Sequence, residues 1–194
     1  MNVMKAKRLQ TDHRMTLREW GELPDDVSAE LVDGVLVDDE VTTETHDVIA
    51  NYLGTFFGSA FWTRGGAVFV ERKFGVARYT GRKPDLAVFL PGPKRLTASA
   101  RVTMTPPDIA IEVITPTPRD TRRDRVEKRR DYARFGIRWY WIIDPALQTI
   151  EILGLARNGR YEHVVDATSG KLRVPGCRGL VLDVDLMWRL ARCG

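Results

Sequence analysis

Two nearly continuous apolar runs lie in the middle of the sequence, and each is associated with one acidic residue. The first run spans 86–90 and directly follows Asp85, whereas the second spans 109–114 and is interrupted by Glu112. Short apolar runs without alternation are typical of strands that are buried on both faces. A buried carboxylate is costly unless a cation, a metal or a proton compensates it. Asp85 and Glu112 are therefore the first candidates for a functional site.

The patterns on either side of these runs predict further helices and strands. Apolar residues recur at helical spacing between Thr43, which can cap a helix, and Gly58. A second, highly charged helix is expected to begin near Arg119 and to stop at Gly136. In chain order, the predicted strands are 29–32, 35–38, 67–76, 86–90, 109–114, 139–143, 149–155 and 160–165.

The connections between these elements follow from their order. The dipeptide Asp33-Gly34 favours a tight hairpin between the first two strands. A basic turn is expected at 78–83, before the strand that follows Asp85. The charged helix between two strands of one sheet requires a crossover, and the final strands form a meander across the turn signal Asn158-Gly159.

The length of 194 residues suits a single domain with a sizeable core. We expect a leader and a short helical turn over residues 1–27, followed by one domain over 28–194. No apolar run approaches the roughly 20 residues of a membrane helix, and no signal peptide is evident. Cys177 and Cys193 fit neither a metal-binding spacing nor a disulfide framework. These features predict a soluble, cytoplasmic protein with no membrane partner.

The formal net charge of +4 is concentrated in one segment. Residues 119–135 contain eight basic and four acidic residues, so this segment alone has the same excess of four. A basic helix suits contact with phosphates, which makes Arg122, Arg123 and Arg130 candidates for binding DNA. The alternative is a solvated helix face whose charges form weak ion pairs.

The combined motifs resemble the Uma-two family of the PD-(D/E)XK nuclease superfamily, the fold of many restriction endonucleases. The resemblance is carried by ELVDG at 30–34, His46, PDLAVFLP from Pro84 and the block 111–145. It implies an α/β fold with a restriction-endonuclease-like mixed central sheet flanked by helices, an N-terminal hairpin and a C-terminal β-meander. It also implies metal-dependent hydrolysis of DNA phosphodiester bonds.

The resemblance assigns roles to individual residues. Asp85 and Glu112 would bind Mg²⁺, or alternatively Mn²⁺, because such hard ions take carboxylates, waters and phosphate oxygens. The usual lysine of the superfamily lies two residues after the second acid, where this chain has Ile114. Lys128, which the resemblance matches as the lysine of the following helix, would replace it. Asp124 lies one turn earlier on the same helix face and would support it.

Glu30 and His46 complete the set of candidate residues as supporting side chains, and simpler roles are open for several members. Asp85 could form an ion pair at the start of a strand, and Lys128 could be a solvated partner of Asp124. Glu30 could only face its hairpin partner, and a lone histidine such as His46 is often a core or capping hydrogen bonder.

Three functions are compatible with these patterns. The leading one is a Mg²⁺-dependent endonuclease that cuts DNA as a homodimer, because two-fold dimers are the commonest assembly. The second is a weak or inactive protein of the nuclease fold that binds nucleic acid or a protein partner, which Ile114 favours. The third is a structural homodimer whose arginine helix is only a soluble face.

Overall fold

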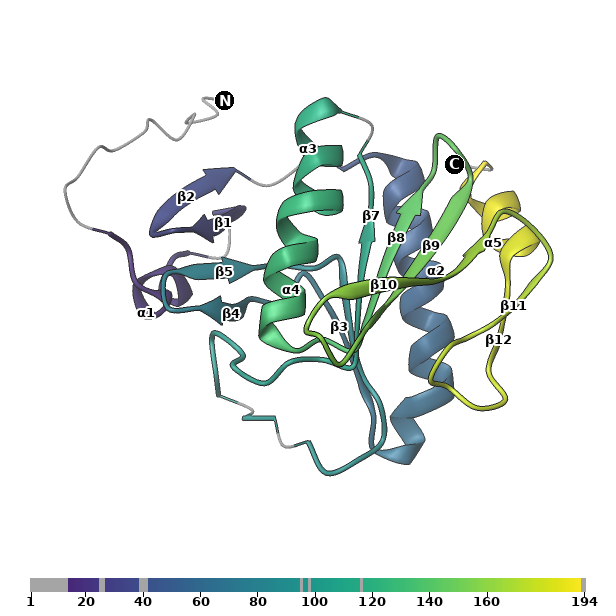
Figure 1. Ribbon diagram of the computed structural model, residues 1–194, viewed down its shortest axis with the longest axis horizontal. Helices are drawn as coiled ribbons and strands as arrows, with labels where there is room; N and C mark the ends of the chain where they lie inside the picture. Colours follow the sequence, from purple (N-terminus) through teal and green to yellow (C-terminus); the bar gives the residue numbers. More distant parts are fainter. Residues whose placement is uncertain are drawn as a thin grey trace.

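The computed structural model describes residues 14–24, 27–38, 42–94, 96–97, 99–115 and 117–192. Most of the expected leader and Cys193 lie outside these ranges. The described chain forms a mixed α/β fold in which a central sheet has one long helix on one side and a helical segment on the other (Figure 1). No helix in these ranges is long and apolar enough to cross a membrane.

The elements have the following bounds. The helical elements are α1 (Leu17–Gly21), α2 (Glu44–Phe61), η1 (Trp62–Arg64), α3 (Pro118–Arg122), the π-helical turn η2 (Arg123–Lys128), α4 (Arg129–Phe135) and α5 (Val184–Ala191). The strands are β1 (Ala29–Val32), β2 (Val35–Asp38), β3 (Ala67–Val70), β4 (Phe74–Ala77), β5 (Thr80–Arg82), β6 (Leu86–Phe89), β7 (Ile109–Val113), β8 (Trp139–Asp144), β9 (Thr149–Leu155), β10 (Tyr161–Ala167), β11 (Lys171–Arg173) and β12 (Val181–Asp183).

The main sheet has six strands in the order β10-β9-β8-β7-β6-β3. Strands β7 and β8 are parallel, and α3, η2 and α4 form the crossover between them, whereas the other neighbours are antiparallel. The predicted crossover and meander are therefore confirmed. Gly136 ends α4 with φ of 89°, a left-handed conformation that glycine adopts without steric cost.

Two apolar cores cover the two faces of this sheet. Along β7, Ile111 and Val113 pack into the core formed with α2 and α5, whereas Ala110 and Ile114 pack into the core formed with α4. Because side chains alternate along a strand, Glu112 lies on the α4 side together with Ala110 and Ile114. The acid therefore points toward the helical crossover.

A smaller sheet has the strand order β2-β1-β5-β4. Its hairpin turn is the predicted Asp33-Gly34, with φ of 51° and 83°. Helix α1 covers this sheet through Trp20, which is fully buried and donates its indole N–H to Ala29 O at 2.9 Å. A side chain at Gly81 would collide with this indole ring, because a Cβ there would lie 2.2 Å from it.

Two sequence predictions about this region are wrong. The strand expected over 67–76 is two strands, β3 and β4, which belong to different sheets and are separated by Glu71 at φ of 47°. The basic turn expected at 78–83 contains strand β5, in which Arg82 is fully buried. A buried arginine is tolerated there because two acids neutralise it, as described below.

Candidate active site

Asp85 and Glu112 lie beside each other on adjacent strands. In the antiparallel register Leu86, the first residue of β6, is opposite Ile111, so extending the register by one residue places Asp85 opposite Glu112 of β7. Asp85 Oδ2 accepts a hydrogen bond from the Val113 N–H at 2.7 Å. The structure therefore brings together the two acids that the apolar runs indicated.

Both carboxylate oxygens of Glu112 have partners from the helical crossover. Tyr132 donates its hydroxyl to Glu112 Oε1 at 2.6 Å, and Lys128 donates from Nζ to Oε2 at 2.8 Å. Lys128 and Glu112 are both buried. Lys128 is thus no solvated surface cation, and its ammonium lies against the carboxylate of β7.

The π-helical turn η2 presents Lys128 together with Asp124. The two side chains are buried, and Lys128 Nζ lies 3.2 Å from Asp124 Oδ1. The position of this turn is also fixed by Tyr140, which donates its hydroxyl to the Asp124 carbonyl at 2.9 Å. A π-helical turn inserted in an α-helical segment is uncommon and often marks a functional site.

Glu30 joins the cluster from the smaller sheet. Its Oε1 lies 3.7 Å from Lys128 Nζ, and its Oε2 accepts a hydrogen bond from Arg82 at 2.7 Å. Arg82 also binds Asp131 of α4 through Nε at 3.0 Å and Nη2 at 2.7 Å. Glu30 therefore does more than face its hairpin partner, because Arg82 links it to the helix that carries Lys128.

His46 contacts the other side of Asp85. The side chain of Thr43 caps α2 by accepting from the His46 N–H, which fixes the first turn of that helix. His46 Nε2 lies 3.1 Å from Asp85 Oδ2, and Nδ1 lies 3.2 Å from Asp47 Oδ1. Burial lowers the pKa of His46, but the hydrogen bond and charge of Asp85, with help from Asp47, raise it to about 9. His46 is therefore cationic at neutral pH.

The site contains more acidic than basic side chains. Its acids are Glu30, Asp85, Glu112, Asp124 and Asp131, and its cations are Arg82, Lys128 and His46. Burial and the neighbouring charges of Asp85 and Asp124 hold the pKa of Glu112 well above its ordinary value, against the opposing charge of Lys128. Burial likewise raises the pKa of Asp124. A further cation near these acids would relieve their repulsion.

The pKa of Glu30 shifts in the opposite direction, although Glu30 is as deeply buried as Glu112. Burial acts to raise its pKa, yet the charges of Lys128 and Arg82 lower it below its ordinary value. For Lys128, burial acts to lower the pKa, and the charges of Asp124, Glu112 and Glu30 raise it well above the ordinary value. Lys128 thus stays an ammonium and Glu30 a carboxylate at neutral pH.

The carboxylates of the cluster offer the kind of oxygen donors that an open metal site uses. In the described ranges, no three His, Cys, Asp or Glu side chains are grouped to hold a metal by themselves. Asp85 and Glu112 offer oxygen donors in a cluster where acidic side chains outnumber basic ones. Mg²⁺ is commonly bound by one or two carboxylates, with waters and substrate phosphates as its other ligands. The chemistry of Asp85 and Glu112 therefore suits such an open site.

The three arginines expected to contact DNA differ in position. The side chain of Arg122 is 76% exposed and that of Arg130 is 59% exposed. Arg123 is buried, and its Nη2 donates to the Asp38 carbonyl at 3.1 Å. Arg123 is therefore poorly placed to contact DNA as predicted, because neighbouring residues on a helix point in different directions.

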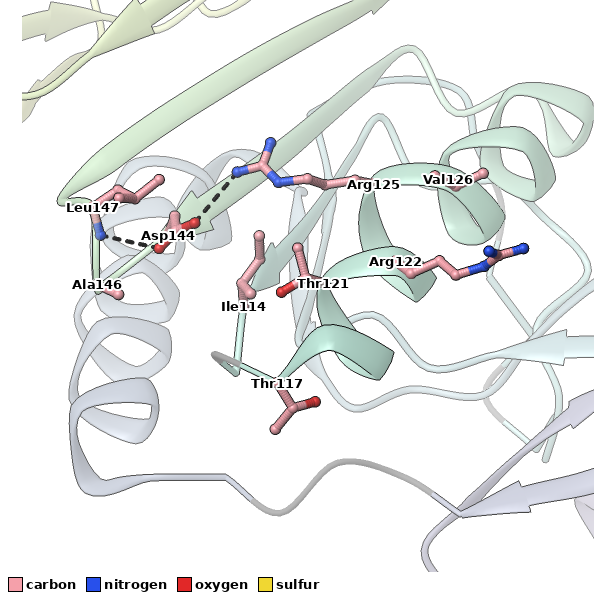
Figure 2. Close-up of a pocket in the computed structure, with 9 residues that line it drawn as sticks. All are labelled: Ile114, Thr117, Thr121, Arg122, Arg125, Val126, Asp144, Ala146 and Leu147. Atoms are coloured by element: carbon pink, nitrogen blue, oxygen red, sulfur yellow. Dashed lines mark hydrogen bonds and ion pairs between the residues drawn. The ribbon is translucent and has the colours of Figure 1, made fainter.

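An open groove of about 530 Å³ has Ile114, two residues after Glu112, in its lining (Figure 2). It runs between the helical crossover and the β8–β9 turn, and it is lined by Ile114, Thr117, Thr121, Arg122, Arg125, Val126, Asp144, Ala146 and Leu147. Arg125 spans the groove, with Nη1 2.7 Å from Glu151 and Nη2 3.4 Å from Asp144. Ile114, which occupies the usual lysine position, thus lines a groove next to the acids.

The fold and the cluster of buried acids with one lysine place the protein in the class of restriction-endonuclease-like α/β proteins. The sequence matches over residues 13–185 the family model of Uma2, described as "Putative restriction endonuclease". The chain belongs to this family. Among proteins of curated function, none matches the sequence.

A solved structure is similar in fold. It is described as a putative nuclease belonging to DUF820 from Anabaena variabilis ATCC 29413, and it superposes with a TM-score of 0.72. The match covers 91% of this chain and 99% of that chain at 20% sequence identity. At this identity the similarity shows the fold alone.

Three further residues hold the cluster together: Arg82, which the sequence suggested only as a substitute cation for Lys128, and Asp131 and Tyr132, which sequence reasoning missed. A signal for the last two was present, since Asp124, Lys128 and Asp131 or Tyr132 recur at helical spacing and therefore share a face. Arg82 had no such signal, because Glu30 and Asp131 lie 52 and 49 residues away along the chain.

Proposed function

We propose that this protein is a metal-dependent endonuclease that hydrolyses DNA phosphodiester bonds with Asp85, Glu112 and Lys128. The observation that carries the proposal is the 2.8 Å contact between Lys128 Nζ and Glu112 Oε2. Through this contact the helix supplies the cation that β7 lacks at Ile114. The family description and the nuclease-like fold support the class of activity.

The charges and contacts of the side chains indicate a separate role for each in the proposed reaction. Asp85 and Glu112 would hold Mg²⁺ or Mn²⁺, an ion that polarises phosphate oxygens and acidifies a bound water. Lys128, kept as an ammonium by its acidic neighbours, is placed to stabilise negative charge on a phosphate beside Glu112. Glu30 and Asp124 orient this ammonium, and His46 orients Asp85.

A second function is favoured by one specific observation. Both oxygens of Glu112 already accept hydrogen bonds from the protein's own Tyr132 and Lys128, and Ile114 occupies the usual lysine position. These features suit a weak or inactive protein of the nuclease fold that binds nucleic acid or a protein partner. The two functions differ in whether the protein cuts DNA.

The test of the proposal is cleavage of supercoiled plasmid DNA at low salt, in Mg²⁺ or Mn²⁺ and in EDTA. The wild type should nick the plasmid only with the divalent ion. Glu112→Gln should reduce the rate by about 100-fold or more, because a carboxylate that binds the metal contributes several kcal/mol to catalysis. Glu162→Gln, an exposed acid on β10, is the matched control and should cut normally. DNA binding by the wild type without any nicking would instead establish the second function.

The role of Lys128 is tested in the same assay. Lys128→Met keeps the length of the side chain and removes its charge, and it should abolish nicking. In that background, Ile114→Lys places an ammonium two residues beyond Glu112 on the same face of β7, so cleavage should partly return. Circular dichroism checks that both variants fold. If Lys128→Met cuts as fast as the wild type, another cation performs the role assigned to Lys128.

A further inference from the structure

The groove lined by Ile114 combines an apolar surface with hydrogen-bonding groups (Figure 2). Ile114 lies at its centre, between Val126 of the π-helical turn and Leu147 of the β8–β9 turn. Val126 is 58% exposed and Leu147 is 68% exposed, so both leave large apolar surfaces in contact with water. The hydroxyl of Thr121 and the carboxylate of Asp144 line the same groove. A flat apolar ligand with polar groups at its edge would satisfy both kinds of surface.

The walls of the groove are held in place by hydrogen bonds. Arg125 connects the helical crossover to Asp144 and Glu151 through the contacts described above. Asp144 Oδ1 also accepts from the Leu147 N–H at 3.1 Å, which fixes the β8–β9 turn. The groove is therefore preformed, which lowers the entropic cost of binding a ligand in it.

The groove is next to the candidate active site. Ile114 follows Glu112 by two residues on the same face, which corresponds to about 7 Å along a strand that rises roughly 3.3 Å per residue. The π-helical turn carries both Val126 and Lys128. The groove also lies beyond the carboxyl ends of the parallel strands β7 and β8, a location where α/β sheets commonly bind ligands.

We propose that this groove receives one unstacked nucleobase, next to the phosphate that lies at Glu112 and Lys128. The inference rests on the proposed function and specifies its substrate as single-stranded DNA, or a duplex from which one base is turned out. The faces of a base would cover Val126 and Leu147, and its edge would meet Thr121 and Asp144. The volume of about 530 Å³ is sufficient for a base, since small-molecule sites typically measure roughly 300–1,000 Å³. The exposed Arg122 at the rim supplies positive charge for a neighbouring phosphate.

The experiment compares the binding of single-stranded and duplex oligonucleotides that contain 2-aminopurine, with Ca²⁺ as the probe cation. The wild type should bind the single strand more tightly, and the 2-aminopurine fluorescence should change as its base leaves the stack. The double variant Val126→Ser with Leu147→Ser should bind the single strand about 5- to 10-fold more weakly, a typical effect of losing base contacts. The double variant should also lose the fluorescence change. Val164→Ser makes the same change at an exposed position on β10 and should behave as the wild type.

The outcomes separate this inference from the proposed function. If the double variant binds the single strand as the wild type does and gives the same fluorescence change, the groove does not receive a base, although the nuclease can still stand. If the double variant alters only self-association, the groove is a contact between copies of the chain, and the inference is overturned. If the wild type binds no nucleic acid even at low salt, the proposed function and the inference fail together.

Discussion

At the scale of single residues, the most informative feature is how buried charges compensate one another. Removing one partner of a buried ion pair typically costs about 3–5 kcal/mol, because the other charge stays buried without compensation. Lys128 contacts three acids, so any change to it disturbs the whole cluster. Variants that keep the size of the side chain therefore test the role of its charge with little change in packing.

The pair of His46 and Asp85 predicts a dependence of stability on pH. The pKa of His46 is raised from 6.5 to about 9 in the folded protein, so the folded state binds the proton more tightly than the unfolded state. This contribution is complete below about pH 6.5 and is lost as pH rises through about 9. A shift of this size corresponds to at most about 3 kcal/mol.

Urea unfolding of the wild type and of His46→Gln in EDTA, at a series of pH values from 6 to about 10, measures this contribution. The wild type should lose more stability over this range than the variant. Glu112 also has a raised pKa and contributes to both curves, so the difference between the curves isolates His46. Parallel curves would show that His46 carries no extra proton in the folded state.

The residues that could be predicted from the sequence share one property. Asp85 and Glu112 lie within or beside apolar runs, so their burial could be inferred locally. Arg82 could not be identified in this way, because its burial depends on Glu30 and Asp131, which only the fold brings close. Arg123 was misjudged for the same reason, since its burial depends on the carbonyl of Asp38.

At the scale of elements, the helical crossover between β7 and β8 has one buried face and one exposed face. Its inner face carries the buried side chains of Asp124, Lys128 and Asp131, whereas Arg122 and Arg130 are exposed. The high charge of this segment alone could not separate the two faces, because acidic and basic residues occur on both. The helix itself and its end at Gly136 were predictable from local signals.

The exposed arginines predict a change in the salt dependence of DNA binding. Each phosphate contact lowers the slope of log K against log salt by about 0.7 for single strands and 0.9 for duplexes. Arg122→Ala with Arg130→Ala should therefore reduce the magnitude of the slope by roughly 1.4–1.8 in a fluorescence-anisotropy titration.

Arg123→Ala is the matched control, because it removes the same charge from the same segment at a buried position. It should lower the melting temperature through loss of its bond to Asp38 and leave the salt slope unchanged. An unchanged slope in the Arg122 and Arg130 variant would show that the exposed face of this helix does not contact DNA.

At the scale of the whole molecule, the candidate site lies where two sheets meet the helical crossover. Glu30 and Arg82 come from the smaller sheet, Glu112 comes from the main sheet, and Lys128 and Asp131 come from the crossover. The site thus depends on the docking of the smaller sheet, which no local pattern in the sequence describes. The order of elements predicted the central sheet. The split of 67–76 between two sheets could not be predicted from the sequence and is seen only in the structure. The homodimer stays a prediction.

The proposed function requires Asp85 and Glu112 to hold a divalent cation in this folded site. The most direct test is the melting temperature of the wild type and of Asp85→Asn, each with EDTA and with increasing Mg²⁺ or Mn²⁺. An ion at about ten times its dissociation constant stabilises the folded state by about 1.4 kcal/mol, which corresponds to roughly 3–6 °C for a chain of this size.

Asp85→Asn keeps an oxygen that can accept from the Val113 N–H, so the variant should remain folded. We predict that the melting temperature of the wild type rises with the ion concentration and reaches a plateau, whereas that of Asp85→Asn does not change. Equal shifts in the two proteins, or no shift in either, would contradict a metal site at Asp85 and Glu112.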